Sequence, residues 1–174
     1  MQAAEREQAA QAAADIFVQH PLFQSSRHIA CYYASKSEFD TQPIINAIWD
    51  NGKICYLPIL AENKSLNFVR YHRNEELQLN QYSIPEPVNT QHTVQTEKLD
   101  LVLTPLTAFD RNGNRIGSGG GFYDRTFAFM FNRGDKSPTI LGVGYAMQEC
   151  EAIQADMWDM KLDGILTESA LIEF

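Results

Sequence analysis

The sequence predicts an α/β protein built on an open, mostly parallel sheet that helices cover on both faces. Short apolar runs typical of buried strands recur along the chain, and segments with helical spacing separate several of them. The chain has 174 residues, of which 44% are hydrophobic, so it is long enough to bury a core of its own. No repeat, low-complexity linker or change in composition divides it, and we therefore expect one domain over residues 1–174.

The first expected elements are a helix and a strand. Residues 5–18 are rich in Ala and Gln, which favour helix, and Pro21 follows where this helix should end. Residues 29–33, IACYY, form a short apolar run between polar residues. Such a run predicts a strand that is buried on both faces.

A second helix is expected over residues 41–49. Ile44, Ile45 and Ile48 have helical spacing and would give this helix one apolar face. Thr41 precedes the apolar run and is a typical N-cap residue, while Asn51-Gly52 is a typical helix end.

Two strands and a long connection are expected next. Residues 53–60, KICYLPIL, predict a strand, with Pro58 marking its end. Residues 66–71, LNFVRY, alternate apolar and polar side chains and predict a half-exposed strand. Residues 81–96 are polar and rich in Pro, include IPEP, and predict an irregular connection.

The rest of the chain continues the alternation of strands and helices. Residues 99–105, LDLVLTP, predict a central strand, a glycine-rich loop follows it, and residues 123–131 predict a helix. Residues 139–145, TILGVGY, and residues 163–167, DGILT, predict two further strands. Ligands bind beyond the carboxyl ends of strands in such sheets, and the glycine-rich loop has that location.

Composition and charge exclude several classes of protein. The net charge of −8 argues against a general nucleic-acid or anionic-membrane surface. The first twenty residues lack the pattern of a signal peptide, and no apolar run reaches the length of a membrane helix. Cys31, Cys55 and Cys150 form no CxxC pair, so we expect free thiols in a reducing compartment. These observations predict a cytoplasmic protein without a nucleic-acid or membrane partner.

The segment PLTAFDRNGNRIGSGGGFYDR, residues 105–125, carries the candidate chemistry. Gly117, Gly119, Gly120 and Gly121 occupy four of five positions just before an expected helix. Backbone amides that converge there can hold an anion, and Arg115 could add a bidentate positive charge. The segment matches neither the Walker A pattern nor GxGxxG. The alternative is a turn that needs glycine only for the path of the chain.

Three residues after the glycines have two interpretations each. Asp124 could complement the positive end of the helix, or it could hold Mg²⁺ beside a phosphate group. Phe122 and Tyr123 could belong to the core, or they could form a flat wall for an aromatic ligand.

The segment FDRNGNRIGSGGGFYDR closely resembles the signature of the 5-formyltetrahydrofolate cyclo-ligase family, also called 5,10-methenyltetrahydrofolate synthetases. The segments IACYYASKSEFDT, GKICYLPIL, IPEP, LDLVLTPLTAFD and WDMKLDGILTE resemble other parts of the family pattern in the same order. The resemblance covers roughly residues 23–168. It implies a three-layer α/β/α sandwich that uses ATP and Mg²⁺ to convert 5-formyltetrahydrofolate into 5,10-methenyltetrahydrofolate, ADP and phosphate.

The resemblance also implies roles for individual residues. Arg115 and Asp124 would be catalytic, and Asp124 and Asp159 would hold Mg²⁺. Tyr33, Glu38, Tyr82 and Phe122 would bind the folate and its polyglutamates. Alternatively, Glu38 could be a carboxylate at the entry of the helix near Thr41, Asp159 could be one of the many acids of the tail, and Tyr33 and Tyr82 could be core aromatics. ATP would contact Arg115, Gly117, Ser118, Gly119, Gly120, Gly121, Phe122 and Tyr123. Arg125 is expected to be a surface or structural residue, and the protein is expected to be a monomer.

The N-terminus departs from the family pattern. Members open with a basic helix of Lys-x-x-x-Arg type that reaches the ATP phosphates, and the only basic residue among the first twenty here is Arg6. The basic arm is therefore expected to be absent: either the start of the chain is shortened, or ATP binding is weakened, or Arg6 substitutes imperfectly. We expect ATP to bind more weakly than in a full-length relative. The alternative functions are a non-catalytic folate- or nucleotide-binding relative and an unrelated protein that handles sugar phosphates.

Overall fold

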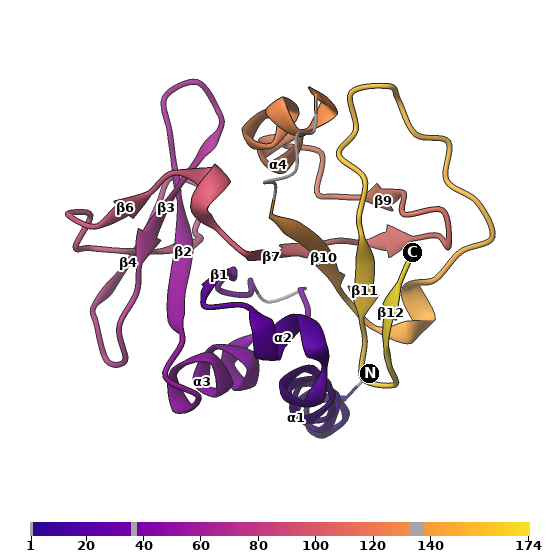
Figure 1. Ribbon diagram of the computed structural model, residues 1–174, viewed down its shortest axis with the longest axis horizontal. Helices are drawn as coiled ribbons and strands as arrows, with labels where there is room; N and C mark the ends of the chain where they lie inside the picture. The colour runs from indigo at the N-terminus through magenta and orange to yellow at the C-terminus, as the bar shows by residue number, and fades with distance from the viewer. Residues whose placement is uncertain (1, 36–37, 133–137) are drawn as a thin grey trace.

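The computed structural model describes residues 2–35, 38–132 and 138–174, and within them an eight-stranded sheet forms the centre of the molecule (Figure 1). Its strands are β1 (His28–Ala30), β2 (Ile54–Leu60), β3 (Leu66–Arg70), β6 (Thr93–Val94), β7 (Leu101–Pro105), β10 (Thr139–Val143), β11 (Gly164–Leu166) and β12 (Leu171–Glu173). They are arranged in the order β12-β11-β10-β7-β1-β2-β3-β6. The five strands from β11 to β2 are parallel, and β12, β3 and β6 pair antiparallel at the two edges. The predicted α/β fold with a mostly parallel sheet is confirmed.

The two faces of the sheet are covered differently. Helices α1 (Ala3–Gln19), α2 (Pro21–Ser25) and α3 (Gln42–Asp50) lie together on one side of the sheet, and α4 (Phe122–Thr126) lies on the other (Figure 1). Leu101 and Leu103 of β7 belong to the core that includes α1 and α3. Val102 lies between them in the strand and belongs to the opposite core with Phe127 and Met130. This alternation is expected of a strand buried on both faces.

The sequence located most elements, but one strand end was wrong. β2 runs through Pro58 to Leu60, and Pro58 pairs with Phe68 of β3. The pairing of β1 with β2 stops at Tyr56, so β2 has β3 as its one neighbouring strand at Pro58. Pro is tolerated there because its missing N–H faces no strand on the other side.

Two further sequence predictions hold only in part. Thr41 is the N-cap residue of α3, as predicted, but its hydroxyl donates to the Tyr32 carbonyl, and the Asp40 side chain accepts from Gln42 N. The helix expected over residues 123–131 divides into α4 and the 3₁₀ helix η2 (Ala128–Asn132). Met130 N donates to the Phe127 carbonyl, three residues earlier, and both side chains are buried in the same core.

Short hairpins were missed altogether. β4 (Leu77–Leu79) pairs with β5 (Pro85–Pro87), and β8 (Ala108–Phe109) pairs with β9 (Arg115–Ile116). The strand of residues 29–33 is also shorter than expected, since β1 ends at Ala30. Residues after Ala30 leave the sheet, and this places Tyr32 and Tyr33 at its carboxyl edge.

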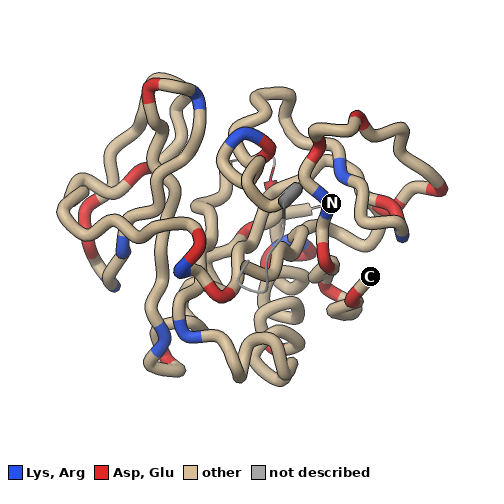
Figure 2. Tube along the Cα trace, turned by 45° about the horizontal axis from the view of Figure 1, so that its top comes forward, with Lys and Arg blue, Asp and Glu red and all other residues tan. Residues whose placement is uncertain are grey.

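The remaining features concern surface and composition. Figure 2 shows acidic residues near the C-terminus, where the sequence concentrates them. Cys31 and Cys55 are buried free thiols, as expected, and Cys150 is a partly buried one.

Two short 3₁₀ helices, η1 (Thr96–Lys98) and η3 (Ala146–Gln148), lie in connections between other elements. Among the described helices, none has the length and apolarity needed to cross a membrane.

Candidate functional site

A cavity of about 840 Å³ opens at the carboxyl edge of the parallel strands. Its wall includes Pro58 and Leu60 from β2, Pro105 from β7, and Tyr32 just after β1. Every residue that the sequence assigned to the site lines this cavity, namely Tyr33, Glu38, Tyr82, Arg115, Gly117, Ser118, Gly119, Gly120, Gly121, Phe122, Tyr123, Asp124 and Asp159. The structure therefore brings together segments that lie more than 120 residues apart in the sequence.

The glycine-rich loop runs from β9 to α4 along this cavity. Gly119 and Gly121 have φ values of 87° and 61°, in the left-handed region that favours glycine. A Cβ atom on Gly120 would lie 2.3 Å from the ring of Phe122. Glycine is needed here for the path of the chain, and the same path lays the loop against the cavity.

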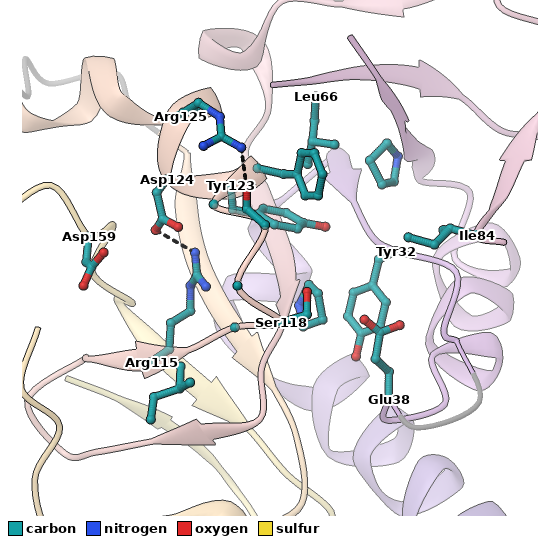
Figure 3. Close-up of a pocket in the computed structure, with 18 of the residues that line it drawn as sticks. Tyr32, Glu38, Leu66, Ile84, Arg115, Ser118, Tyr123, Asp124, Arg125 and Asp159 are labelled. Atoms are coloured by element: carbon teal, nitrogen blue, oxygen red, sulfur yellow. Dashed lines mark hydrogen bonds and ion pairs between the residues drawn. The ribbon is translucent and has the colours of Figure 1, made fainter. Parts of the chain in front are cut away.

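Arg115 and Asp124 form an ion pair within the cavity wall. Arg115 Nη2 lies 2.9 Å from Asp124 Oδ1, and the guanidinium lies over the Tyr123 ring at 5.9 Å (Figure 3). The Arg115 side chain is only 7% exposed, and its Nε atom is buried without a hydrogen-bond partner among the described residues. A buried donor of this kind is costly unless a ligand supplies an acceptor.

The two candidate metal ligands have different surroundings. Asp124 Oδ1 also accepts from Met160 N at 3.1 Å, whereas Asp124 Oδ2 has no hydrogen bond with any residue that the structure describes. Asp159 accepts from Asp156 N through Oδ2. The described residues contain no group of three or more His, Cys, Asp and Glu that could hold a metal ion by themselves. A hard cation would therefore need further oxygen ligands from a bound substrate.

Aromatic side chains form another part of the cavity wall. The rings of Tyr82 and Phe122 meet edge to face at 5.9 Å, and Tyr82 is half exposed. Burial, together with the neighbouring Cys31 thiol and Glu38 carboxylate, raises the pKa of Tyr123 well above its usual value. Tyr123 therefore stays protonated and can donate a hydrogen bond. This wall suits a flat ligand with polar edges.

Glu38 lies across the cavity from the metal candidates. In Figure 3, Glu38 and Asp159 lie on opposite sides of Arg115. Glu38 Oε2 accepts from Ser35 N at 2.7 Å. Asp40, not Glu38, accepts from the first turn of α3, so the helix-entry role considered for Glu38 belongs to Asp40.

Sequence reasoning missed several residues of the cavity wall. Glu86 accepts from Leu60 N and from Asn80 Nδ2, both at 2.8 Å, and so fastens the β4–β5 hairpin to the end of β2. Trp158 lines the cavity although its surface is 61% exposed. Its position in the sequence, directly before the candidate ligand Asp159, was the signal that could have identified it. Glu86 lies in the IPEP segment that resembles the family pattern, but nothing in that segment indicated which groups its carboxylate would bind.

Arg125 also lines the cavity and contacts its backbone. Its guanidinium donates to the carbonyls of Gly120 and Lys64, and it lies over the Phe122 ring at 5.6 Å. These contacts join the glycine-rich loop to the turn between β2 and β3. They agree with the structural role expected for Arg125.

Comparison with known proteins gives consistent matches. The model of the 5-formyltetrahydrofolate cyclo-ligase family matches residues 1–168. The 5-formyltetrahydrofolate cyclo-ligase of Haemophilus influenzae is 38% identical over 144 residues, which cover 81% of this chain and 75% of that protein. The Escherichia coli enzyme of the same name is 33% identical over 173 residues, which cover 98% of this chain and 93% of that protein.

Solved structures agree with these matches. The NMR structure of Aquifex aeolicus 5,10-methenyltetrahydrofolate synthetase has a TM-score of 0.82 at 28% identity, covering 99% of this chain and 84% of that one. A 5,10-methenyltetrahydrofolate synthetase from Mycoplasma pneumoniae has a TM-score of 0.71 at 20% identity, and the match covers 97% of this chain and 90% of that one. This likeness concerns the fold alone. With a family match over nearly its whole length, the chain belongs to the 5-formyltetrahydrofolate cyclo-ligase family, and it is a ligase.

Proposed function

We propose that the chain converts 5-formyltetrahydrofolate and ATP into 5,10-methenyltetrahydrofolate, ADP and phosphate, with Mg²⁺. The observation that carries the proposal is the buried Nε atom of Arg115 beside the glycine-rich loop, which has no hydrogen-bond partner in the part of the chain that the structure describes. An unsatisfied guanidinium donor next to backbone amides suits a phosphate group. The substrate includes the polyglutamates of the folate, and the protein acts as a cytoplasmic monomer.

The two ligands have complementary places in the cavity. The folate would lie against the aromatic wall of Tyr82 and Phe122, with Tyr33 beside it and Glu38 at its polar edge. The ATP phosphates would lie along Gly117, Ser118, Gly119, Gly120, Gly121 and Tyr123, with Arg115 Nε as a donor. This arrangement would put the γ-phosphate between the glycine-rich loop and the formyl group.

The donor set of the site fits Mg²⁺. Asp124 Oδ2 accepts no hydrogen bond from the described residues, and Asp159 supplies a second carboxylate to the same cavity. Mg²⁺ prefers one or two carboxylates together with phosphate oxygens. When bound there, the ion would neutralise negative charge on the phosphates.

The reaction then needs positioning more than a protein nucleophile. The formyl oxygen attacks the γ-phosphorus and ADP leaves, which turns a poor leaving group into a phosphate ester. N10 attacks the activated carbon, the C–O bond breaks, and phosphate departs as N10 loses its proton. Arg115 and the loop amides stabilise the charge on the transferred phosphoryl group, and Glu38 orients the folate.

The first test measures methenyltetrahydrofolate by its absorbance, with and without Mg-ATP. Asp124→Ala is expected to abolish Mg-dependent turnover because it removes a metal ligand, while the circular dichroism spectrum stays unchanged. Glu38→Ala is expected to raise KM for the folate far more than KM for ATP. Glu151→Ala and Glu7→Ala remove exposed carboxylates outside the cavity and serve as controls.

Three outcomes would contradict parts of this proposal. Unchanged activity of Asp124→Ala would refute its metal role. Equal effects of Glu38→Ala on both KM values would refute its assignment to the folate. Tight binding of both ligands without turnover by the natural chain would instead favour a non-catalytic relative.

A further inference from the structure

Arg6 of α1 reaches the loop that carries Glu38. Its Nη2 atom donates to the Glu38 carbonyl oxygen at 2.7 Å, and its Nε atom donates to the Tyr145 hydroxyl at 3.1 Å. Tyr145 follows β10 and is 8% exposed. A single guanidinium therefore joins three parts of the chain: α1, the loop after β1, and the end of β10.

The loop held by Arg6 also has hydrogen bonds among its own described residues, including Ser35 N to Glu38 Oε2 at 2.7 Å and the Thr41 hydroxyl to the Tyr32 carbonyl. It connects β1 to α3 outside the sheet. The Tyr32 hydroxyl donates to the Phe39 carbonyl at 3.2 Å, and the Phe39 ring packs on Tyr145 at 4.7 Å. Tyr145 thus contacts both the loop and Arg6. Arg6 and Tyr145 therefore both help to fix the backbone around Glu38.

We propose that Arg6 is a positioning residue for the folate: by holding the Glu38 carbonyl, it aims the Glu38 carboxylate into the cavity. The inference rests on the folate role proposed above for Glu38. Arg6 itself is not among the described residues that line the cavity, so it acts through Glu38. The sequence had suggested that Arg6 replaces a basic arm on ATP, and its contacts instead point to the folate side.

Arginine has the geometry needed to donate to the Tyr145 hydroxyl and to the Glu38 carbonyl at the same time. Its planar guanidinium presents several donors in a fixed fork, so one side chain can satisfy two acceptors that come from different elements. Lysine would keep the charge but lacks this fork. The bond to Glu38 is made to a backbone oxygen, so loss of Arg6 changes the position of Glu38 without removing its carboxylate.

The test measures dissociation constants for 5-formyltetrahydrofolate and for ATP by isothermal titration, alongside the KM values. Arg6→Ala is expected to weaken folate binding about tenfold and to change ATP binding less than about twofold. Arg6→Lys should recover only part of this loss. Tyr145→Phe removes the acceptor of Arg6 Nε and should give a smaller effect in the same direction.

A double variant tests whether Arg6 acts through Glu38. Glu38→Gln alone should weaken folate binding, and adding Arg6→Ala should weaken it little further, because both changes remove the same interaction. Arg27→Ala removes an exposed positive charge elsewhere, and Gln8→Ala changes an exposed residue of α1. Both controls should bind the two ligands like the natural chain.

Each alternative result overturns the inference. A loss confined to ATP binding would assign Arg6 to the nucleotide, and independent effects of Arg6→Ala and Glu38→Gln would separate the two residues. Normal folate binding by Glu38→Gln would remove the basis of the inference. The natural chain is measured in the same titrations. If it binds both ligands without turnover, the proposed reaction is refuted, and the dissociation constants of the variants still decide the role of Arg6. If Arg6→Ala does not fold, Arg6→Lys and Tyr145→Phe decide it.

Discussion

Arg115 keeps Asp124 at 2.9 Å while its own Nε atom has no partner among the described residues. The pair is close to neutral as a unit, so it offers a phosphate donor and a metal ligand side by side. An anion alone would compete with Asp124 for Arg115, and a cation alone would compete with Arg115 for Asp124. A metal-bound nucleotide satisfies both groups at once, which favours binding of ATP and Mg²⁺ as a complex.

Arg115→Lys tests the contribution of the guanidinium. Lysine can still pair with Asp124 but cannot supply the Nε donor, so KM for Mg-ATP should rise about tenfold with little change in KM for the folate. Steady-state kinetics with each substrate varied in turn would measure this. Arg111→Lys, at an exposed ion pair with Glu149, is the matched control. Equal changes in both KM values would show that Arg115 supports the cavity as a whole.

Sequence reasoning found the residues of the site that lie in compact motifs. Arg115 and Asp124 fall within one run of glycines and charges, and Glu38 falls within the short segment IACYYASKSEFDT that begins with a predicted strand. Glu86 lies in the IPEP segment, but its role could not be found in this way, because it depends on Leu60 N and Asn80 Nδ2, which only the fold brings near. A hydrogen bond to backbone leaves no pattern in the sequence.

At the scale of elements, long apolar runs were predictable and short hairpins were not. β7 and β10 are buried on both faces, so each is a continuous apolar run. β8 and β9 have two residues each, too few to display a period. The Asp110 carboxylate stabilises their hairpin by accepting hydrogen bonds from Asn112 and Asn114, in a place where the strands are too short to form many hydrogen bonds with each other.

Asp110→Asn tests this element. Buried Asp110 accepts from Asn112 N, Asn114 N, Asn114 Nδ2 and Ile153 N at 2.8–3.0 Å, and so ties the β8–β9 hairpin to the loop leading to Asp159. In Asp110→Asn, the side-chain NH₂ group would face N–H donors that now bond to the carboxylate. We therefore expect the free energy of unfolding to fall by about 1–3 kcal/mol at pH 7. Denaturant titration would measure it, with the exposed Asp156→Asn as control.

The effect of Asp110 should depend on pH in a defined direction. Burial raises the pKa of Asp110, but the four hydrogen bonds outweigh it and leave the pKa below its usual value. Its stabilisation is therefore present above the pKa of the unfolded chain and is lost as pH falls through the lower folded value. The difference between Asp110→Asn and the natural chain should shrink over that acidic window. A difference that stays constant with pH would refute this account.

At the scale of the whole molecule, the cavity depends on nearly every part of the chain. Its wall is built from the loop after β1, the end of β2, the β4–β5 hairpin, the glycine-rich loop and the segment around Trp158. The strands beneath it share one sheet with a core on each face. A ligand in the cavity therefore contacts segments that unfolding would separate, and its binding energy should stabilise the fold as a unit.

Thermal unfolding tests whether the chain behaves as one cooperative domain. Without ligand we expect a single transition, seen alike by far-ultraviolet circular dichroism and by tryptophan fluorescence, because Trp49 and Trp158 report on opposite regions. 5-Formyltetrahydrofolate at about one hundred times its dissociation constant should add about 2.7 kcal/mol and raise Tm by roughly 5–10 °C. Non-coincident transitions, or a rise in Tm seen by one probe alone, would show that the cavity and the sheet unfold separately.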